Sequence, residues 1–120
     1  MGRDIRNYKV SQLSHKLTLR IYELTKRFPA EERFGLISQM RRSAYSIPMN
    51  LVEGGARKSE CEFRQFVNIA KGSSAEIQYQ LELVRDLAYI TNDEYTELNN
   101  TYTEVGKMLT GLLVKLKANS

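Results

Sequence analysis

The side chains best suited to catalysis in this 120-residue sequence are its one histidine, His15, and its one cysteine, Cys61. A general base needs a partner within hydrogen-bond reach, but no acid lies three or four residues from His15 on either side. Cys61 lies at a predicted helix start without a second cysteine to resolve an oxidised form. One histidine and one cysteine also exclude multi-His and multi-Cys metal sites. We predict that the chain is not an enzyme and has no catalytic residue, metal site or cofactor.

Two pairs of adjacent acids, Glu31-Glu32 and Asp93-Glu94, are the next candidates for acid–base chemistry. Neighbours in a helix point in different directions, and both pairs lie at predicted helix starts, where the dipole favours acids. The glycine-rich run 54–58 lacks the spacing of a phosphate-binding loop and follows a helix rather than a strand. We interpret this run as a turn.

A polar cluster in the middle of the chain has two interpretations. Arg42 and Glu53 are eleven residues apart, about three helical turns, and therefore share a helix face. The cluster either holds two helices together or contacts a ligand such as nucleic acid, and we favour the first. The predicted structural network consists of Arg42, Asn50, Glu53 and Glu76.

Positive charge is concentrated at the start of the chain. Residues 1–28 contain seven Lys or Arg and two acids, whereas the whole chain has a net charge of +4 and a pI of about 9.3. Such a segment suits a polyanionic partner, although every bundle helix also needs a solvated outer face. The predicted nucleic-acid contacts are Lys16, Arg20, Arg27, Arg41, Arg57 and Lys58.

Apolar residues recur at steps of three and four throughout, which predicts helices and no strands. We expect an all-α, up-down-up-down antiparallel four-helix bundle in a single domain, 1–120, because the connections are short. The predicted helices span residues 9–28, 30–53, 60–90 and 92–117. Ser59 and Thr91 each begin a capping box.

The second predicted helix contains Pro48, which should kink it, and its buried face begins with Phe34 and Ile37. Gly72 lies in the middle of the third helix, where glycine costs about 1 kcal/mol relative to alanine. Close approach of a neighbouring helix at Gly72 would offset this cost.

Apolar residues outside the core stripes predict self-association. They form a second line along the third helix, stepping by four, four and three residues, which would leave an exposed patch on a monomer. The predicted oligomer interface is Tyr79, Leu83, Leu87 and Ile90. No apolar run approaches the roughly 18 residues of a membrane span, and no signal peptide is evident. We therefore expect a cytoplasmic protein with no membrane partner.

The middle of the chain resembles a known family. Its motifs include Phe28-Pro29, Phe34-Gly35-Leu36, Arg41-Arg42, Ser46-Ile47-Pro48 and Glu53-Gly54. They resemble four-helix-bundle proteins encoded in intervening sequences of bacterial 23S ribosomal RNA genes, over about residues 8–116. The family is similar to the accessory protein of diversity-generating retroelements, a homopentamer that binds nucleic acid and a reverse transcriptase. The resemblance implies a bacterial homopentamer.

Two functional hypotheses remain from the sequence. The first is a non-enzymatic, oligomeric nucleic-acid-binding protein, with RNA as the favoured partner and DNA as the other partner that the sequence permits. The alternative is a protein-interaction scaffold that docks a polymerase or another protein and has no direct role with nucleic acid.

Overall fold

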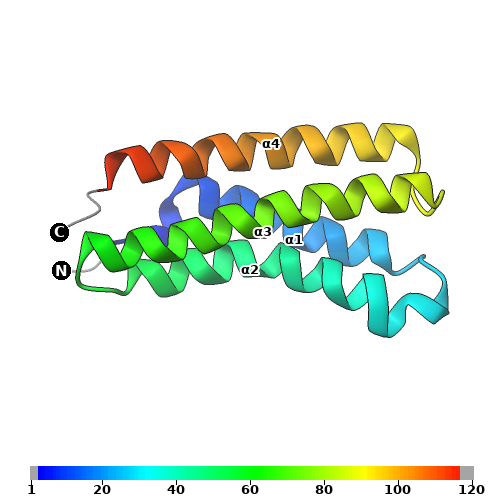
Figure 1. Ribbon diagram of the computed structural model, residues 1–120, viewed down its shortest axis with the longest axis horizontal. Coiled ribbons are helices and arrows are strands. Elements are labelled where there is room, and N and C mark those ends of the chain that lie inside the picture. Colours follow the sequence, from blue (N-terminus) through cyan, green and yellow to red (C-terminus); the bar gives the residue numbers. More distant parts are fainter. Residues whose placement is uncertain (1–2, 117–120) are drawn as a thin grey trace.

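The computed structural model describes residues 3–116, and every regular element among them is helical. The bundle consists of α1 (Lys9–Thr25), α2 (Ser38–Gly55), α3 (Glu60–Asp86) and α4 (Asn92–Lys115). Consecutive helices lie side by side and run in opposite directions (Figure 1). The bundle measures 46 × 24 × 22 Å. The predicted all-α bundle is confirmed.

The segment before α2 differs from the sequence prediction. Instead of a helix from residue 30, it forms a 3₁₀ turn, Ala30–Glu32, and a π-helical turn, Arg33–Ile37. Gly35 interrupts the helical backbone with φ −113° and ψ −111°. Phe34 is consequently 90% exposed, so its predicted place in the core is wrong.

Three helices end earlier than predicted. α4 ends at Lys115, and its predicted end at residue 117 lies outside the described residues. α1 stops at Thr25 rather than 28, because the amides of Lys26 and Phe28 each bond a carbonyl three residues back. α3 stops at Asp86 rather than 90 in a Schellman motif, with Ala88 at φ 63° where glycine is usual. This turn buries Ile90, which is 5% exposed. Ile90 therefore belongs to the core, and its predicted place in an oligomer interface is wrong.

The helix starts follow the predicted caps. The Thr91 hydroxyl accepts from the Glu94 amide at 3.0 Å, and the Glu94 carboxylate accepts from the Thr91 amide at 2.9 Å, so this capping box is confirmed. The Ser59 hydroxyl likewise accepts from the Glu62 amide at 3.0 Å. The Glu62 carboxylate accepts from the Ser59 hydroxyl at 3.3 Å and not from the Ser59 amide, so only the first bond of this predicted box is present.

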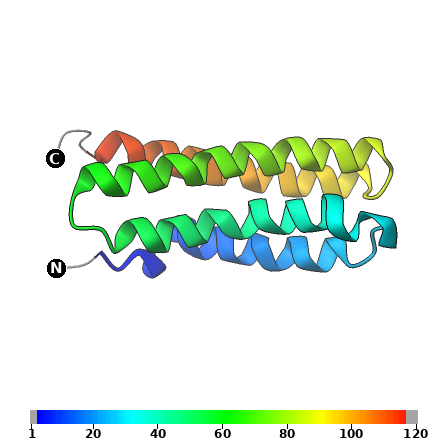
Figure 2. The ribbon, with the colours of Figure 1, turned by 60° about the horizontal axis from the view of Figure 1, so that its bottom comes forward.

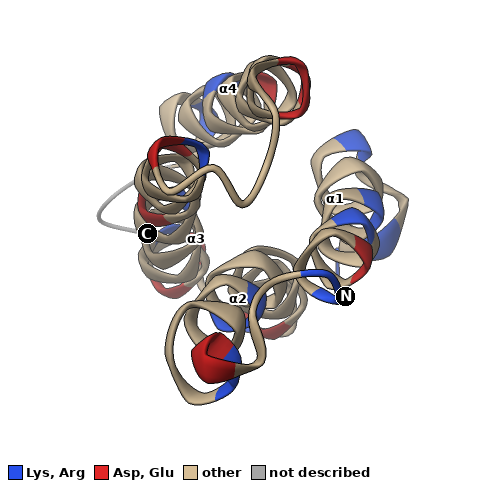
Figure 3. Ribbon diagram, turned by 90° about the vertical axis from the view of Figure 1, so that its right-hand side faces the viewer, with Lys and Arg blue, Asp and Glu red and all other residues tan. Residues whose placement is uncertain are grey.

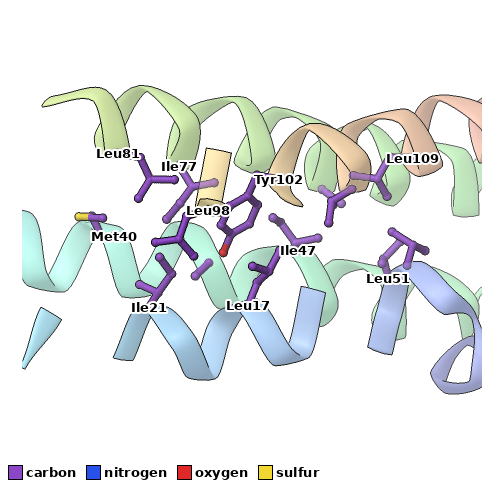
Figure 4. Packing of buried hydrophobic residues seen from close by; sticks show 14 of the residues in the cluster. Leu17, Ile21, Met40, Ile47, Leu51, Ile77, Leu81, Leu98, Tyr102 and Leu109 are labelled. Carbon is purple, nitrogen blue, oxygen red and sulfur yellow. The ribbon is translucent and has the colours of Figure 1, made fainter. Parts of the chain in front are cut away.

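One apolar core runs the length of the bundle and draws on all four helices (Figure 4). Leu17, Ile47, Ile77 and Leu109 represent α1, α2, α3 and α4 in it. Tyr102 projects into this core from α4 with no exposed surface, and its hydroxyl has no hydrogen-bond partner. Burial accordingly raises the pKa of Tyr102.

The Thr18 hydroxyl of α1 lies within hydrogen-bond distance of the carbonyl that the proline inside α2 leaves without its helical partner. Pro48 has no amide hydrogen, so the Ala44 carbonyl cannot receive the usual bond from four residues ahead. The buried Thr18 hydroxyl of α1 faces this carbonyl at 3.2 Å and also bonds the Ser14 carbonyl at 2.8 Å. α2 is helical through Pro48, and the expected kink there stays a prediction.

This arrangement predicts a coupling between Thr18 and Pro48. Thr18→Val keeps the shape of the side chain but removes the donor, and should lower the free energy of unfolding by about 1–2 kcal/mol. In a Pro48→Ala background a backbone amide can reach the Ala44 carbonyl, so the same change should cost much less. A double-mutant cycle by urea denaturation measures the coupling. Additive effects would contradict the assignment.

Candidate nucleic-acid interface

Two of the predicted phosphate contacts are held by acids of α4. The Arg20 guanidinium lies 3.9 Å from the Glu97 carboxylate. Arg27 donates a hydrogen bond to Glu94, and this bond lowers the pKa of the Glu94 carboxyl. Both arginines therefore tie α1 to α4, a role that the local sequence does not reveal because the partners are about seventy residues away in the chain.

Arg41 and Arg57 are also engaged within the protein. The Arg41 guanidinium donates to the Thr25 hydroxyl at 2.9 Å and lies 4.6 Å from the centre of the Tyr22 ring. Arg57 donates to the Glu53 carboxylate at 3.2 Å and stacks on Phe66 at 4.9 Å. These contacts orient both guanidinium groups, and the carboxylate of Glu53 also offsets the charge of Arg57.

Cations without an ion pair are spread over the part of the chain that the structure describes, and some of them lie before α1 and in its first half. Lys16 is exposed and has no ion pair or hydrogen bond within residues 3–116, and the same holds for Lys58 in the α2–α3 turn. Arg6 and Lys9 are exposed and unpaired in the same way. We call Arg6, which lies in the turn before α1, together with Lys9 and Lys16 of α1 the α1 cationic face. Arg6 lines a depression beside α2, whereas Lys9 lines one beside α4. Figure 3 shows basic segments along the ribbon of α1.

The six predicted contacts do not form one patch. Arg27 follows α1 at one end of the bundle, whereas Arg57 and Lys58 lie in the α2–α3 turn at the other end (Figure 1). A signal for the α1 cationic face was nevertheless present in the sequence. Neither Lys9 nor Lys16 has an acid three or four residues away, whereas Arg57 has Glu53 at the spacing of a helical ion pair.

A groove of about 660 Å³ lies between α1 and α2, which are neighbours in Figure 2. Its apolar lining includes Pro48, Met49 and Val52 of α2, and its polar lining includes Ser11 of α1. Ser11 is only 6% exposed, yet its hydroxyl has no hydrogen-bond partner. The sequence alone does not reveal this groove, because the groove depends on how two helices pack.

Two further kinds of feature, a metal-binding cluster and a membrane-spanning helix, are absent from the part of the chain that the structure describes. No group of three or more His, Cys, Asp or Glu residues is placed to hold a metal ion there. No helix in the same range is long and apolar enough to cross a membrane.

Comparison with known proteins gives the family. The sequence pattern of the 23S rRNA-intervening sequence protein family matches residues 6–111. The chain belongs to this family. This 23S rRNA-intervening sequence protein is also similar to a crystal structure from Bacteroides thetaiotaomicron, described as a protein of unknown function from the S23 ribosomal protein family. The two are 31% identical, with 87% of this chain and 97% of that chain covered and a TM-score of 0.78. No curated protein matches.

In this 23S rRNA-intervening sequence protein, the predicted polar network is built differently from the expectation. The Asn50 amide bonds the Ser46 carbonyl at 2.7 Å, and the Ser46 hydroxyl bonds that of Ser73 at 2.8 Å. The Ser43 hydroxyl donates to the Glu76 carboxylate at 2.8 Å. Glu53 pairs instead with Arg57, and no ion pair joins the exposed Arg42 to Glu53 or Glu76 among residues 3–116. Serines therefore link α2 to α3.

Proposed function

We propose that this protein is a non-enzymatic, self-associating nucleic-acid-binding protein and that its target is single-stranded RNA. The α1 cationic face supports this proposal most directly. Its three cations are exposed and have no acidic partner within the described residues, so phosphate groups can neutralise them without breaking an internal ion pair. The family name gives where such proteins are encoded, so the choice of RNA over DNA is itself part of this proposal.

Self-association is supported by exposed apolar side chains on α3. Ile69, Tyr79 and Leu87 are 51%, 62% and 45% exposed, and Leu83 is half-buried between them. We call these four residues the α3 stripe. Aromatic and aliphatic residues in such a row are typical of the core of a protein interface.

We expect RNA affinity to fall steeply with salt. For a single strand, each neutralised phosphate contributes about 0.7 to the steepness with which log K falls against log salt. The three cations of the α1 cationic face therefore predict about tenfold weaker binding at 150 mM than at 50 mM salt. Fluorescence anisotropy with a labelled mixed-sequence oligonucleotide measures this. The double variant Lys9→Gln, Lys16→Gln should reduce the slope by about 1.4.

The matched control is Lys71→Gln, Lys107→Gln, which removes two exposed lysines from α3 and α4. This control should leave the slope unchanged if the α1 cationic face carries the contacts. No binding at 50 mM salt, or binding that is indifferent to salt, would overturn the proposal.

One observation favours the alternative, a scaffold that docks another protein. Phe34 is 90% exposed beside the interrupted backbone at Gly35, and a large exposed aromatic side chain suits a protein interface. A purified polymerase or other partner that binds this protein after nuclease treatment, and that Phe34→Ala releases, would favour the scaffold. Loss of the same complex on nuclease treatment would favour nucleic-acid binding.

A further inference from the structure

The groove between α1 and α2 has the dimensions and composition of a binding site for a small organic group. Its volume of about 660 Å³ falls in the usual range for such sites. Apolar side chains of α2, including Pro48 and Met49, face polar side chains of α1 across it. Met49 is 56% exposed, so a flat ring that entered the groove would remove apolar surface from water.

Ser11, which lines the groove, has a buried hydroxyl group without a hydrogen-bond partner. The other buried hydroxyls of α1, those of Ser14, Thr18 and Thr25, all donate to carbonyls of their own helix. The Ser11 hydroxyl is buried to a similar degree but has no partner. A buried hydroxyl without a partner is costly, and a polar group of a ligand in the groove would supply one.

The polar lining suits the edge of a nucleobase. Gln12 and His15 are exposed, line the groove beside Ser11 and bring amide and imidazole groups that can donate or accept hydrogen bonds. Tyr45 of α2 lines the same groove and is half-buried, so its ring can stack on a base. Unstacked bases are commonly recognised by this combination of aromatic stacking and edge hydrogen bonds.

The surrounding charge suits the phosphates of the same strand. Arg6 lines the groove itself, and Gln12 and His15 lie in sequence between Lys9 and Lys16 of the α1 cationic face. The one acid in the lining, Glu53, is paired with Arg57 at 3.2 Å. Arg6 is therefore the cation that the groove itself offers to a phosphate, and the one carboxylate in its lining is already paired.

We propose that the α1–α2 groove binds an unstacked nucleobase of single-stranded RNA, with Tyr45 stacking on the ring and Ser11 bonding its edge. This inference rests on the proposed function and adds a base-binding site to its phosphate contacts. Phosphate contacts then supply the salt dependence, and the groove supplies the preference for strands that carry bases.

The test compares a single-stranded RNA with an abasic strand of the same length, using fluorescence anisotropy at low salt. The wild-type protein should bind the intact strand about tenfold more tightly. Tyr45→Ala should remove most of this difference and leave the affinity for the abasic strand unchanged. The matched control is Tyr95→Ala, since Tyr95 is also half-buried but lies on α4, where it stacks on Arg85.

Ser11→Ala provides a second variant that does not depend on the fold tolerating Tyr45→Ala, because it removes only the unpartnered hydroxyl. It should weaken binding of the intact strand about threefold, with no change for the abasic strand. Equal wild-type affinity for both strands, with normal salt dependence, would overturn the base site and leave the proposed function standing. Binding of neither strand would overturn both.

A second copy of the chain is the competing occupant of the groove. In that case Tyr45→Ala would dissociate the oligomer in analytical ultracentrifugation. The difference in affinity between the intact and abasic strands would survive in both Tyr45→Ala and Ser11→Ala. That result would also overturn the base site.

Discussion

Replacing Gly54 with alanine is expected to lower the free energy of unfolding by about 3 kcal/mol. A Cβ atom at Gly54 would lie 2.6 Å from Cβ of Phe66 and 2.9 Å from Cδ1 of Phe63. The Phe66 Cβ is fixed to the backbone of α3 and Phe63 is fully packed, at 1% exposure. Relief of the overlap would therefore require α3 to move away from α2. Urea denaturation followed by circular dichroism measures the change.

Gly72→Ala is the matched control and should have the opposite effect. A Cβ atom at Gly72 would meet nothing within 4 Å, so alanine there gains only helix propensity, about 1 kcal/mol. No close approach of a neighbouring helix offsets the cost of Gly72, whereas α3 does approach Gly54 closely. Similar effects of the two substitutions would contradict this account.

Local patterns in the sequence predicted the elements well because the forces that define them are local. The three- and four-residue spacing of apolar side chains gave four helices, and Thr91 with Glu94 marked the start of α4. The failures occurred where tertiary contacts override local preference. Ala88 adopts a left-handed conformation that normally favours glycine, so nothing in the sequence marked the end of α3.

The candidate site was harder to predict, because it depends on which side chains meet across helices. Arg20 and Arg27 share a stripe with Lys16 in the sequence, yet only the two arginines lie opposite Glu97 and Glu94 of α4. Charge counting cannot separate the paired cations from the unpaired ones. The groove and the orphaned Ser11 hydroxyl likewise arise from the packing of α1 against α2.

The α3 stripe leads to the second large effect, on self-association. The wild-type protein is expected to sediment as one species of about five times the 13.9 kDa chain mass, the pentamer that the family resemblance implies. α1 and α3 lie diagonally opposite one another in the bundle (Figure 3), so the α3 stripe and the α1 cationic face point in different directions. Copies can therefore associate through α3 while α1 stays available to RNA.

Tyr79→Glu should weaken this association about 100-fold. The substitution would bury an uncompensated charge in the interface, at a cost of about 3 kcal/mol, three residues from the existing carboxylate of Glu76. Val114→Glu is the matched control, because Val114 is 81% exposed on α4 and lies outside the stripe. Sedimentation velocity at micromolar concentration should show the first variant as a monomer and the second as wild type. A wild-type species near 13.9 kDa would exclude self-association, and a wild-type dimer would exclude the pentamer, because one isologous contact closes without forming a larger ring.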